Sequence, residues 1–314
     1  MRAASDPIVR CMRGHKVDRN MICGTVPATD KSEDGNKVGN VHKKLVKDLL
    51  PSVVVVGLWD DELQAIRQVG SGFVASRKNG LIVTAGHTLF NMDPGRSFGK
   101  PLFGMKDAKV VIGLIPDNKE NNKIAVFRYF AEIVAEDIHN MDACILKITT
   151  KLENDVADAA LIGGQSKKLV QNFQDELLPS LKITSRYELE QSVRIIGFNQ
   201  GGEGRLEKGK HVNRSADVVQ GYICKQFIPS DDHSSSSGDS SSSEGVFAPR
   251  EEIVINNCPT IDGHSGGPCV NDEGKVIGIL SRADPVDRGR CYLVPSSEIR
   301  ILINKAKKRG NMRY

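Results

Sequence analysis

The chain has 314 residues, 39% hydrophobic and 26% charged, which is typical of a globular protein with a large buried core. Its net charge of +4 comes from 43 basic and 39 acidic residues, and no basic stripe with interleaved aromatics crosses it, so nucleic acid is not a favoured partner. No apolar run is long enough to span a membrane, and the N-terminus lacks the apolar core of a secretory signal.

The first part of the chain predicts a flexible extension followed by a folded domain. Residues 1–39 are polar and broken by Gly, Pro and Asp, which predicts an N-terminal extension without fixed structure. From Asn40 on, Val41, Leu45 and Leu49 recur at helical spacing and predict a short helix. We therefore place the folded domain at residues 40–310.

The body of the chain predicts strands. Short runs rich in Val, Ile and Phe, with Gly, Asn, Asp or Pro between most of them, lie at 52–58, 68–76, 81–87, 109–115, 124–134 and 143–148. A second series lies at 192–198, 218–227, 251–256, 268–271, 275–281 and 290–294. Many short strands with little helix predict an all-β barrel or sandwich.

Three segments interrupt or end the strands. The spacing of Leu169, Val170, Phe173 and Leu177 predicts a helix inserted within 151–178. Residues 231–245 are almost all Ser, Asp, Gly and Glu and predict a mobile loop. An apolar stripe after residue 296 predicts a C-terminal helix that packs on the last barrel.

The seven cysteines are an odd number, which favours free thiols in a reducing, intracellular compartment over a secreted disulfide framework. Cytoplasm, nucleus and organelle all fit. A zinc site could be drawn from Cys258, His264, Cys269 and Cys291, but the close cysteine pair typical of structural zinc sites is missing. We expect neither a metal nor a cofactor.

A glycine-rich loop contains the candidate nucleophile. Ser265 lies in Gly-His-Ser-Gly-Gly-Pro between two strands, where small residues let the backbone turn sharply. The N–H groups of Gly263 and Ser265 could then form an oxyanion hole. The alternative is a glycine-rich turn that happens to hold a serine.

Two further residues complete a candidate triad. His87 follows an apolar strand that ends in Thr-Ala-Gly, and no other histidine has that context. Asp142 precedes an apolar strand, where a carboxylate needs a hydrogen-bonding partner, and a histidine N–H would serve. Asp137 competes with Asp142 but precedes no apolar run. Acyl transfer by serine needs such a base, an orienting acid and oxyanion donors.

These motifs together resemble the chymotrypsin-clan, trypsin-like serine proteases, in the order His87, Asp142, Ser265. Within that clan the chain is similar to the HtrA/Do-like (Deg) branch without a PDZ domain. The similarity spans about residues 41–307 and is most specific at 70–87 (GSGFVASRKNGLIVTAGH) and 263–279 (GHSGGPCVNDEGKVIGI).

The resemblance implies two orthogonal six-stranded β-barrels, one over about residues 50–150 and one over about 179–310, with the active site between them. His87 would be the general base, Asp142 its orienting acid and Ser265 the nucleophile. Polypeptides would be the substrates, with a role in protein quality control, and homotrimers occur in the family. The alternatives are a catalytically silent protein-binding module on the protease fold and a processing protease of narrow specificity.

The resemblance also suggests substrate contacts at Pro259, Ser281, Arg282 and Ala283. Pro259 stands where a trypsin has its acidic pocket floor, so we expect preference for small or medium apolar residues before the cleaved bond. His264 replaces the aspartate that pairs with a new N-terminal amine in trypsin-like zymogens. We therefore expect no activation by N-terminal cleavage.

Overall fold

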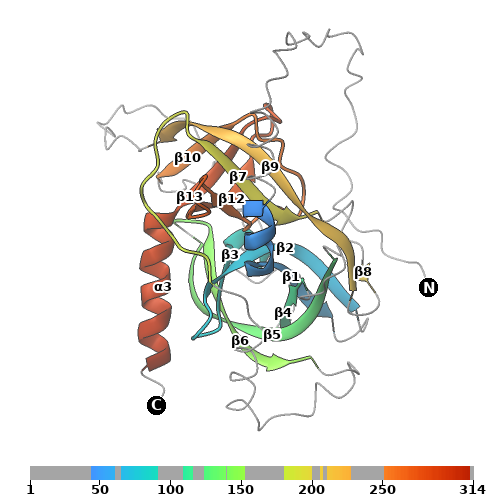
Figure 1. Ribbon diagram of the computed structural model, residues 1–314. Coiled ribbons are helices and arrows are strands. Elements are labelled where there is room, and N and C mark those ends of the chain that lie inside the picture. Colours follow the sequence, from blue (N-terminus) through green and yellow to red (C-terminus); the bar gives the residue numbers. More distant parts are fainter. Residues whose placement is uncertain are drawn as a thin grey trace, which may run out of the picture. The chain divides into compact units, whose positions relative to one another are not determined.

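The computed structural model describes residues 44–60, 65–90, 109–115, 124–138, 140–152, 180–199, 206–207, 211–227 and 251–311. All of them belong to one compact unit, Val41–Tyr314 (Figure 1). The flexible extension, the inserted helix and the Ser-rich loop predicted from the sequence lie outside the described residues. Of the predicted first helix, residues 44–49 are described and are helical.

Six strands form the first ring: β1 (Val53–Asp60), β2 (Ala65–Ser76), β3 (Leu81–Ala85), β4 (Lys109–Leu114), β5 (Ile124–Asp137) and β6 (Ala143–Lys151). Every neighbouring pair is antiparallel, in the order β1-β2-β3-β6-β5-β4, and β4 pairs with β1 again, which closes a barrel. A two-residue strand, β8 (Leu206–Glu207), also pairs with β2.

A second antiparallel ring contains β7 (Ser192–Phe198), β9 (His211–Phe227), β10 (Glu252–Asn256), β11 (Pro268–Val270), β12 (Val276–Ala283) and β13 (Cys291–Pro295). Its order is β7-β9-β10-β13-β12-β11, and β11 pairs with β7. The first part of β9 also pairs with β5, so the two rings share an edge. The all-β double barrel predicted from the sequence is confirmed.

The run of four valines in β1 shows why such segments become buried strands. Side chains alternate between the two faces of a strand. Val53 and Val55 pack in a cluster that includes residues of the second ring and the C-terminal helix, whereas Val54 and Val56 pack in a cluster confined to the first ring. Because both faces are buried, the strand is apolar throughout rather than alternating.

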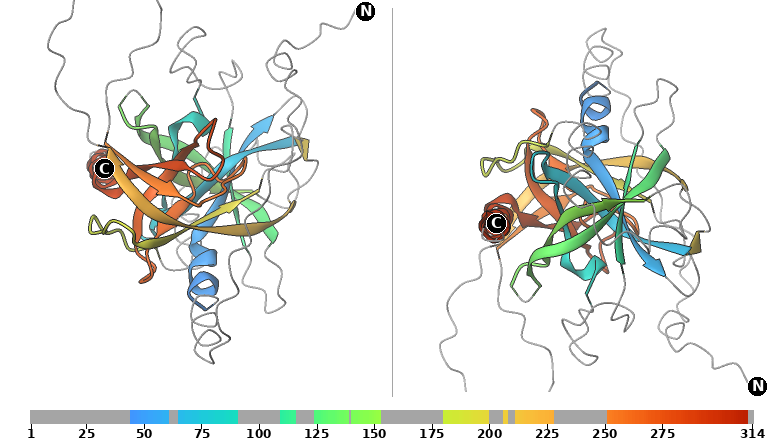
Figure 2. Two further views of the ribbon diagram at one scale, coloured as in Figure 1. Left: turned by 90° about the horizontal axis from the view of Figure 1, so that it is seen from above. Right: turned by 90° about the horizontal axis from the view of Figure 1, so that it is seen from below.

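The C-terminal helix α3 (Ser296–Asn311) follows β13 directly and is seen end-on in both views of Figure 2. Its apolar stripe of Ile299, Leu302, Ile303 and Ala306 is buried, as the sequence predicted. The helix contacts β5 and β6 of the first ring as well as β12 and β13 of the second. The expectation that it packs on the last barrel is confirmed, and its further contacts with the first ring were not predicted, because an apolar stripe does not specify every partner. Among the described residues, no helix has the length and apolar character needed to cross a bilayer.

Candidate active site

His87 lies in the short helical turn η3 (Gly86–Thr88) immediately after β3. The register of the antiparallel strands β3 and β6 pairs Ala85 with Ala143. Gly86, which follows Ala85, and Asp142, which precedes Ala143, are therefore neighbours. The N–H of Gly86 accordingly donates to the carbonyl of Asp142 at 3.0 Å. A Cβ on Gly86 would lie 2.7 Å from the side chain of Ile138, which explains a glycine before the histidine.

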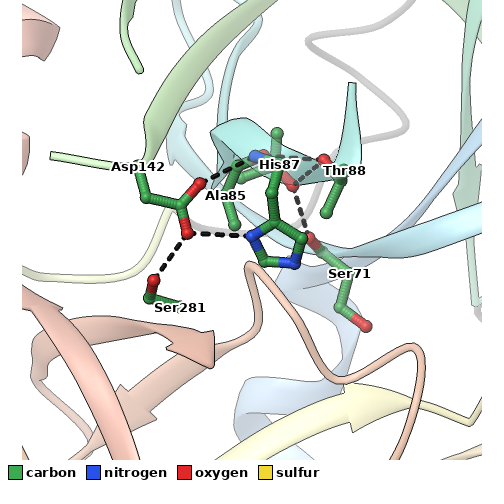
Figure 3. Close-up of polar contacts among 7 residues, drawn as sticks. Ser71, Ala85, His87, Thr88, Asp142 and Ser281 are labelled. Carbon is green, nitrogen blue, oxygen red and sulfur yellow. Dashed lines mark hydrogen bonds and ion pairs between the residues drawn. The ribbon is translucent and has the colours of Figure 1, made fainter. Parts of the chain in front are cut away.

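Asp142 is held by three hydrogen bonds (Figure 3). Its Oδ1 accepts from the backbone N–H of His87 at 2.7 Å, and its Oδ2 lies 2.8 Å from the His87 Nδ1. The hydroxyl of Ser281, on β12 of the second ring, donates to the same Oδ2 at 2.5 Å. The carboxylate is therefore fixed by groups from both barrels.

The pKa of Asp142 is set by opposing effects. Burial, which leaves it 3% exposed, would raise the pKa. Attraction to His87 and the hydrogen bonds from His87 and Ser281 outweigh burial, and the pKa lies below its usual value. An ionised carboxylate only accepts hydrogen bonds, so the Nδ1 of His87 carries a hydrogen, and in the neutral ring the Nε2 is then the acceptor.

The loop that carries Ser265 lies between β10 and β11 and packs against the strand end that carries His87. The N–H of Gly266 donates to the carbonyl of Leu280, and the carbonyl of Ser265 accepts from the N–H of Ser71 at 2.8 Å. Gly266 has φ +81°, and a Cβ there would lie 2.6 Å from the backbone N of Ala85. Only glycine permits this approach. Ser265 itself is half-buried.

Four groups of the predicted catalytic residues have no intramolecular partner within the described part of the chain: the Nε2 of His87, the hydroxyl of Ser265 and the N–H groups of Gly263 and Ser265. The His87 side chain is 32% exposed, so its outer nitrogen can meet a substrate. A carbonyl oxygen that gains negative charge needs donors of this kind, left unoccupied in the resting protein.

His264 faces away from this chemistry. It is completely buried and packs on β7, where a Cβ on Gly197 would lie 2.9 Å from the His264 Cα. Neither ring nitrogen has a hydrogen-bond partner among the described residues. The closest acid is Asp217, whose Oδ2 lies 4.0 Å from the Nε2. Burial lowers the pKa of His264, and Asp217 only partly opposes this effect.

This buried histidine gives a prediction for the pH dependence of stability. The unfolded chain takes up a proton at His264 near pH 6.5, whereas the folded chain resists protonation. The free energy of unfolding should therefore fall as the pH drops below about 6.5. His264→Phe should flatten that fall between about pH 6.5 and 5, while the loss from Asp142, below about pH 4, should remain. Urea unfolding at several pH values measures the free energy of unfolding of the wild type and of His264→Phe. Parallel curves of this free energy against pH would contradict the prediction.

The predicted substrate contacts lie on two segments. Pro259 and Ala283 are exposed, and Arg282 follows Ser281 on β12. The guanidinium of Arg282 forms a 2.7 Å ion pair with the buried Glu252 and lies 3.7 Å from the ring centroid of Tyr292. Its charge is thus balanced within the protein, and the expected preference for apolar side chains stays a prediction.

The described cysteines, Cys144, Cys224, Cys258, Cys269 and Cys291, are all free thiols. Among the described residues no group of three or more His, Cys, Asp or Glu side chains is arranged to hold a metal ion. The zinc alternative therefore has no support in this part of the chain.

Two closed antiparallel barrels, with a His–Asp pair beside a glycine-rich serine loop, define a chymotrypsin-clan serine endopeptidase. A family model of the trypsin-like peptidase domain matches residues 70–279, which include His87, Asp142 and Ser265. The chain belongs to this family. No curated protein shows significant sequence similarity to it.

One solved structure shares the fold. The active form of the Rv3671c protease from M. tuberculosis matches with a TM-score of 0.51 and 15% identity, over 93% of this chain and 94% of that chain. An inactive form of the same protease matches with a TM-score of 0.48 and 16% identity, over 85% of this chain and 95% of that one.

Two serine side chains at the site had no assigned role in the sequence-based prediction. Ser281 was expected to contact substrate through its backbone, and its hydroxyl also binds Asp142. Ser71 connects β2 to the serine loop. The only signal for Ser71 was its position between two glycines, in the segment Gly-Ser-Gly.

Proposed function

We propose that this protein hydrolyses peptide bonds through an acyl-enzyme on Ser265. The observation that carries the proposal is the 2.8 Å contact between the His87 Nδ1 and the ionised Asp142, because it leaves the Nε2 as a base. His87 would take the proton of the Ser265 hydroxyl as that oxygen attacks the carbonyl carbon. The N–H groups of Gly263 and Ser265 would stabilise the oxyanion.

The second half of the reaction uses the same groups. His87 gives its proton to the leaving amine, and the peptide bond breaks to leave an ester on Ser265. A water molecule, deprotonated by His87, then attacks that ester, the bond to the Ser265 oxygen breaks to release the acid, and His87 returns the proton to that oxygen. Asp142 keeps the imidazole oriented and stabilises its charged form throughout.

Intact-mass measurement tests the covalent step. Acid-quenched wild-type protein mixed with an activated ester should show a mass increase of one acyl group, and Ser265→Ala should not. A protein that hydrolyses the ester and never carries the added mass, even in the first turnover, would refute the acyl-enzyme. A folded protein without any turnover would support the alternative of a silent binding module.

β12 offers a place for an extended peptide beside Ser265. Its pairing with β11 ends at Ile279, whereas its pairing with β13 continues to Ala283. The edge that faces β11 therefore extends past the end of that strand at Arg282 and Ala283. A substrate segment could add to this edge as a strand, with main-chain hydrogen bonds supplying affinity.

This mode of binding supports a role in protein quality control, the function suggested by the similarity to the HtrA/Do-like branch. A folded protein seldom presents a free extended segment, whereas an unfolded one does. We expect a reduced, unfolded globular protein to be cleaved at least about tenfold faster than its native form, since the native form is cleaved only through rare opening. Equal cleavage rates, measured by gel densitometry, or cleavage of a single native loop would favour a processing protease.

A further inference from the structure

Ser71 lies on β2 in the first ring, and its carbonyl accepts from the Thr84 hydroxyl there at 2.8 Å, yet its N–H and its hydroxyl bond to the second ring. Its N–H donates to the carbonyl of Ser265 at 2.8 Å, and its hydroxyl donates to the carbonyl of Gly263 at 2.7 Å. The same hydroxyl accepts from the N–H of Phe198, on β7, at 2.8 Å. The residue is completely buried.

The Ser71 hydroxyl has one hydrogen, so its orientation is determined by these partners. Because the Phe198 N–H can only donate, the oxygen accepts there and its hydrogen points to the Gly263 carbonyl. The side chain therefore acts as donor and acceptor at once. Alanine can do neither, and a cysteine thiol does both weakly.

The two carbonyls that Ser71 holds lie on either side of the Ser265 N–H. Fixing the Gly263 carbonyl fixes the peptide plane between Gly263 and His264, and fixing the Ser265 carbonyl fixes the plane after Ser265. Gly263 has φ +95°, which is only one of several backbone conformations that a glycine adopts at little cost. The loop needs outside contacts to keep one orientation.

We propose that Ser71 is a positioning residue for the oxyanion-binding loop. Through it, the first barrel, which carries His87 and Asp142, also sets the direction of the donors in the second. This inference rests on the proposed function of Gly263 and Ser265. It adds a residue that touches no substrate and acts on the transition state through the loop.

The test compares Ser71→Ala with wild type on a peptide p-nitroanilide that has an apolar residue before the cleaved bond. Losing an oxyanion donor outright costs about 10²–10³ in kcat, so a loosened loop should cost about tenfold to a hundredfold, with KM little changed. A peptidyl trifluoromethyl ketone of matching sequence forms an oxyanion on the enzyme. Its inhibition constant should rise by the same factor as kcat/KM falls.

Ser296→Ala is the matched control. Ser296 is also buried, and its hydroxyl donates to a backbone carbonyl, that of Thr184, at 2.6 Å, away from the serine loop. The Ser296→Ala variant should lose about as much stability as Ser71→Ala but keep the wild-type kcat and inhibition constant. If Ser71→Ala does not fold, Ser71→Cys retains the approximate volume with a weaker donor and should shift both constants in the same direction.

The outcomes separate the two claims. Unchanged kcat and inhibition constant in a folded Ser71 variant, an equal loss in Ser296→Ala, or a rise in KM alone would each overturn the positioning role while the wild type remains active. An inactive wild type whose Ser265 never reacts would overturn the proposed function itself.

Discussion

Replacing Ser265 with alanine is expected to lower kcat by about 10⁶-fold, because the proposed acyl-enzyme forms on its hydroxyl and only binding and oxyanion stabilisation would remain. The Ser265 hydroxyl has no hydrogen-bond partner in the described part of the chain, so its removal should leave the melting temperature nearly unchanged. Hydrolysis of a fluorogenic peptide at saturating concentration, with differential scanning fluorimetry in parallel, measures both effects.

Ser192→Ala provides the control for this change. Ser192 is a half-buried serine at the start of β7, and its hydroxyl accepts a 3.0 Å hydrogen bond from Gln220, outside the serine loop. This variant should keep full activity. If Ser265→Ala retained kcat within tenfold of the wild type after contaminating proteases are excluded, Ser265 would not be the nucleophile.

Asp142→Asn should lower kcat by about 10⁴-fold while leaving KM within a few-fold. An amide in place of the carboxylate has one accepting oxygen, but Asp142 accepts from the His87 N–H, the His87 Nδ1 and the Ser281 hydroxyl. An amide N–H facing Nδ1 would favour the wrong tautomer, with the hydrogen on Nε2. His87 could then no longer accept the proton of Ser265.

Asp137→Asn distinguishes this effect from a general loss of negative charge. Asp137 lies five residues earlier and accepts from the exposed Asn140 in the turn before Asp142. Its replacement should change kcat less than about threefold, because its carboxylate bonds to Asn140 and not to His87. Similar losses in both variants, in a series of steady-state assays, would show that Asp142 acts through the turn rather than through His87.

The strands and their grouping could be predicted from the sequence because burial on both faces leaves a local pattern. The four valines of β1 are apolar for this reason, and the break at Pro51 precedes them. The contact of α3 with the last barrel was predicted, but its contact with the first barrel was not, since its stripe of Ile299, Leu302 and Ile303 would suit any apolar surface.

At the site, the His87 and Ser265 segments were recognisable because each combines a strand with small residues that a tight turn requires. The hydroxyl contacts of Ser71 and Ser281 were not, since one buried serine leaves no periodic pattern and the partners of these hydroxyls lie more than 100 residues away in the chain. His264 drew attention only as a substitution in a familiar loop. Its burial against Gly197 without a polar partner depends on how β7 packs.

The central claim, that Ser265 is a nucleophile activated by His87 and Asp142, is tested most directly by mapping a fluorophosphonate adduct. The wild-type protein, treated with the probe and digested, should carry the modification on the peptide that contains Ser265. Labelling should be lost in Ser265→Ala and strongly slowed in Asp142→Asn. A folded wild-type protein that peptide mass spectrometry finds unlabelled, or labelled at another serine with equal efficiency in Ser265→Ala, would contradict it.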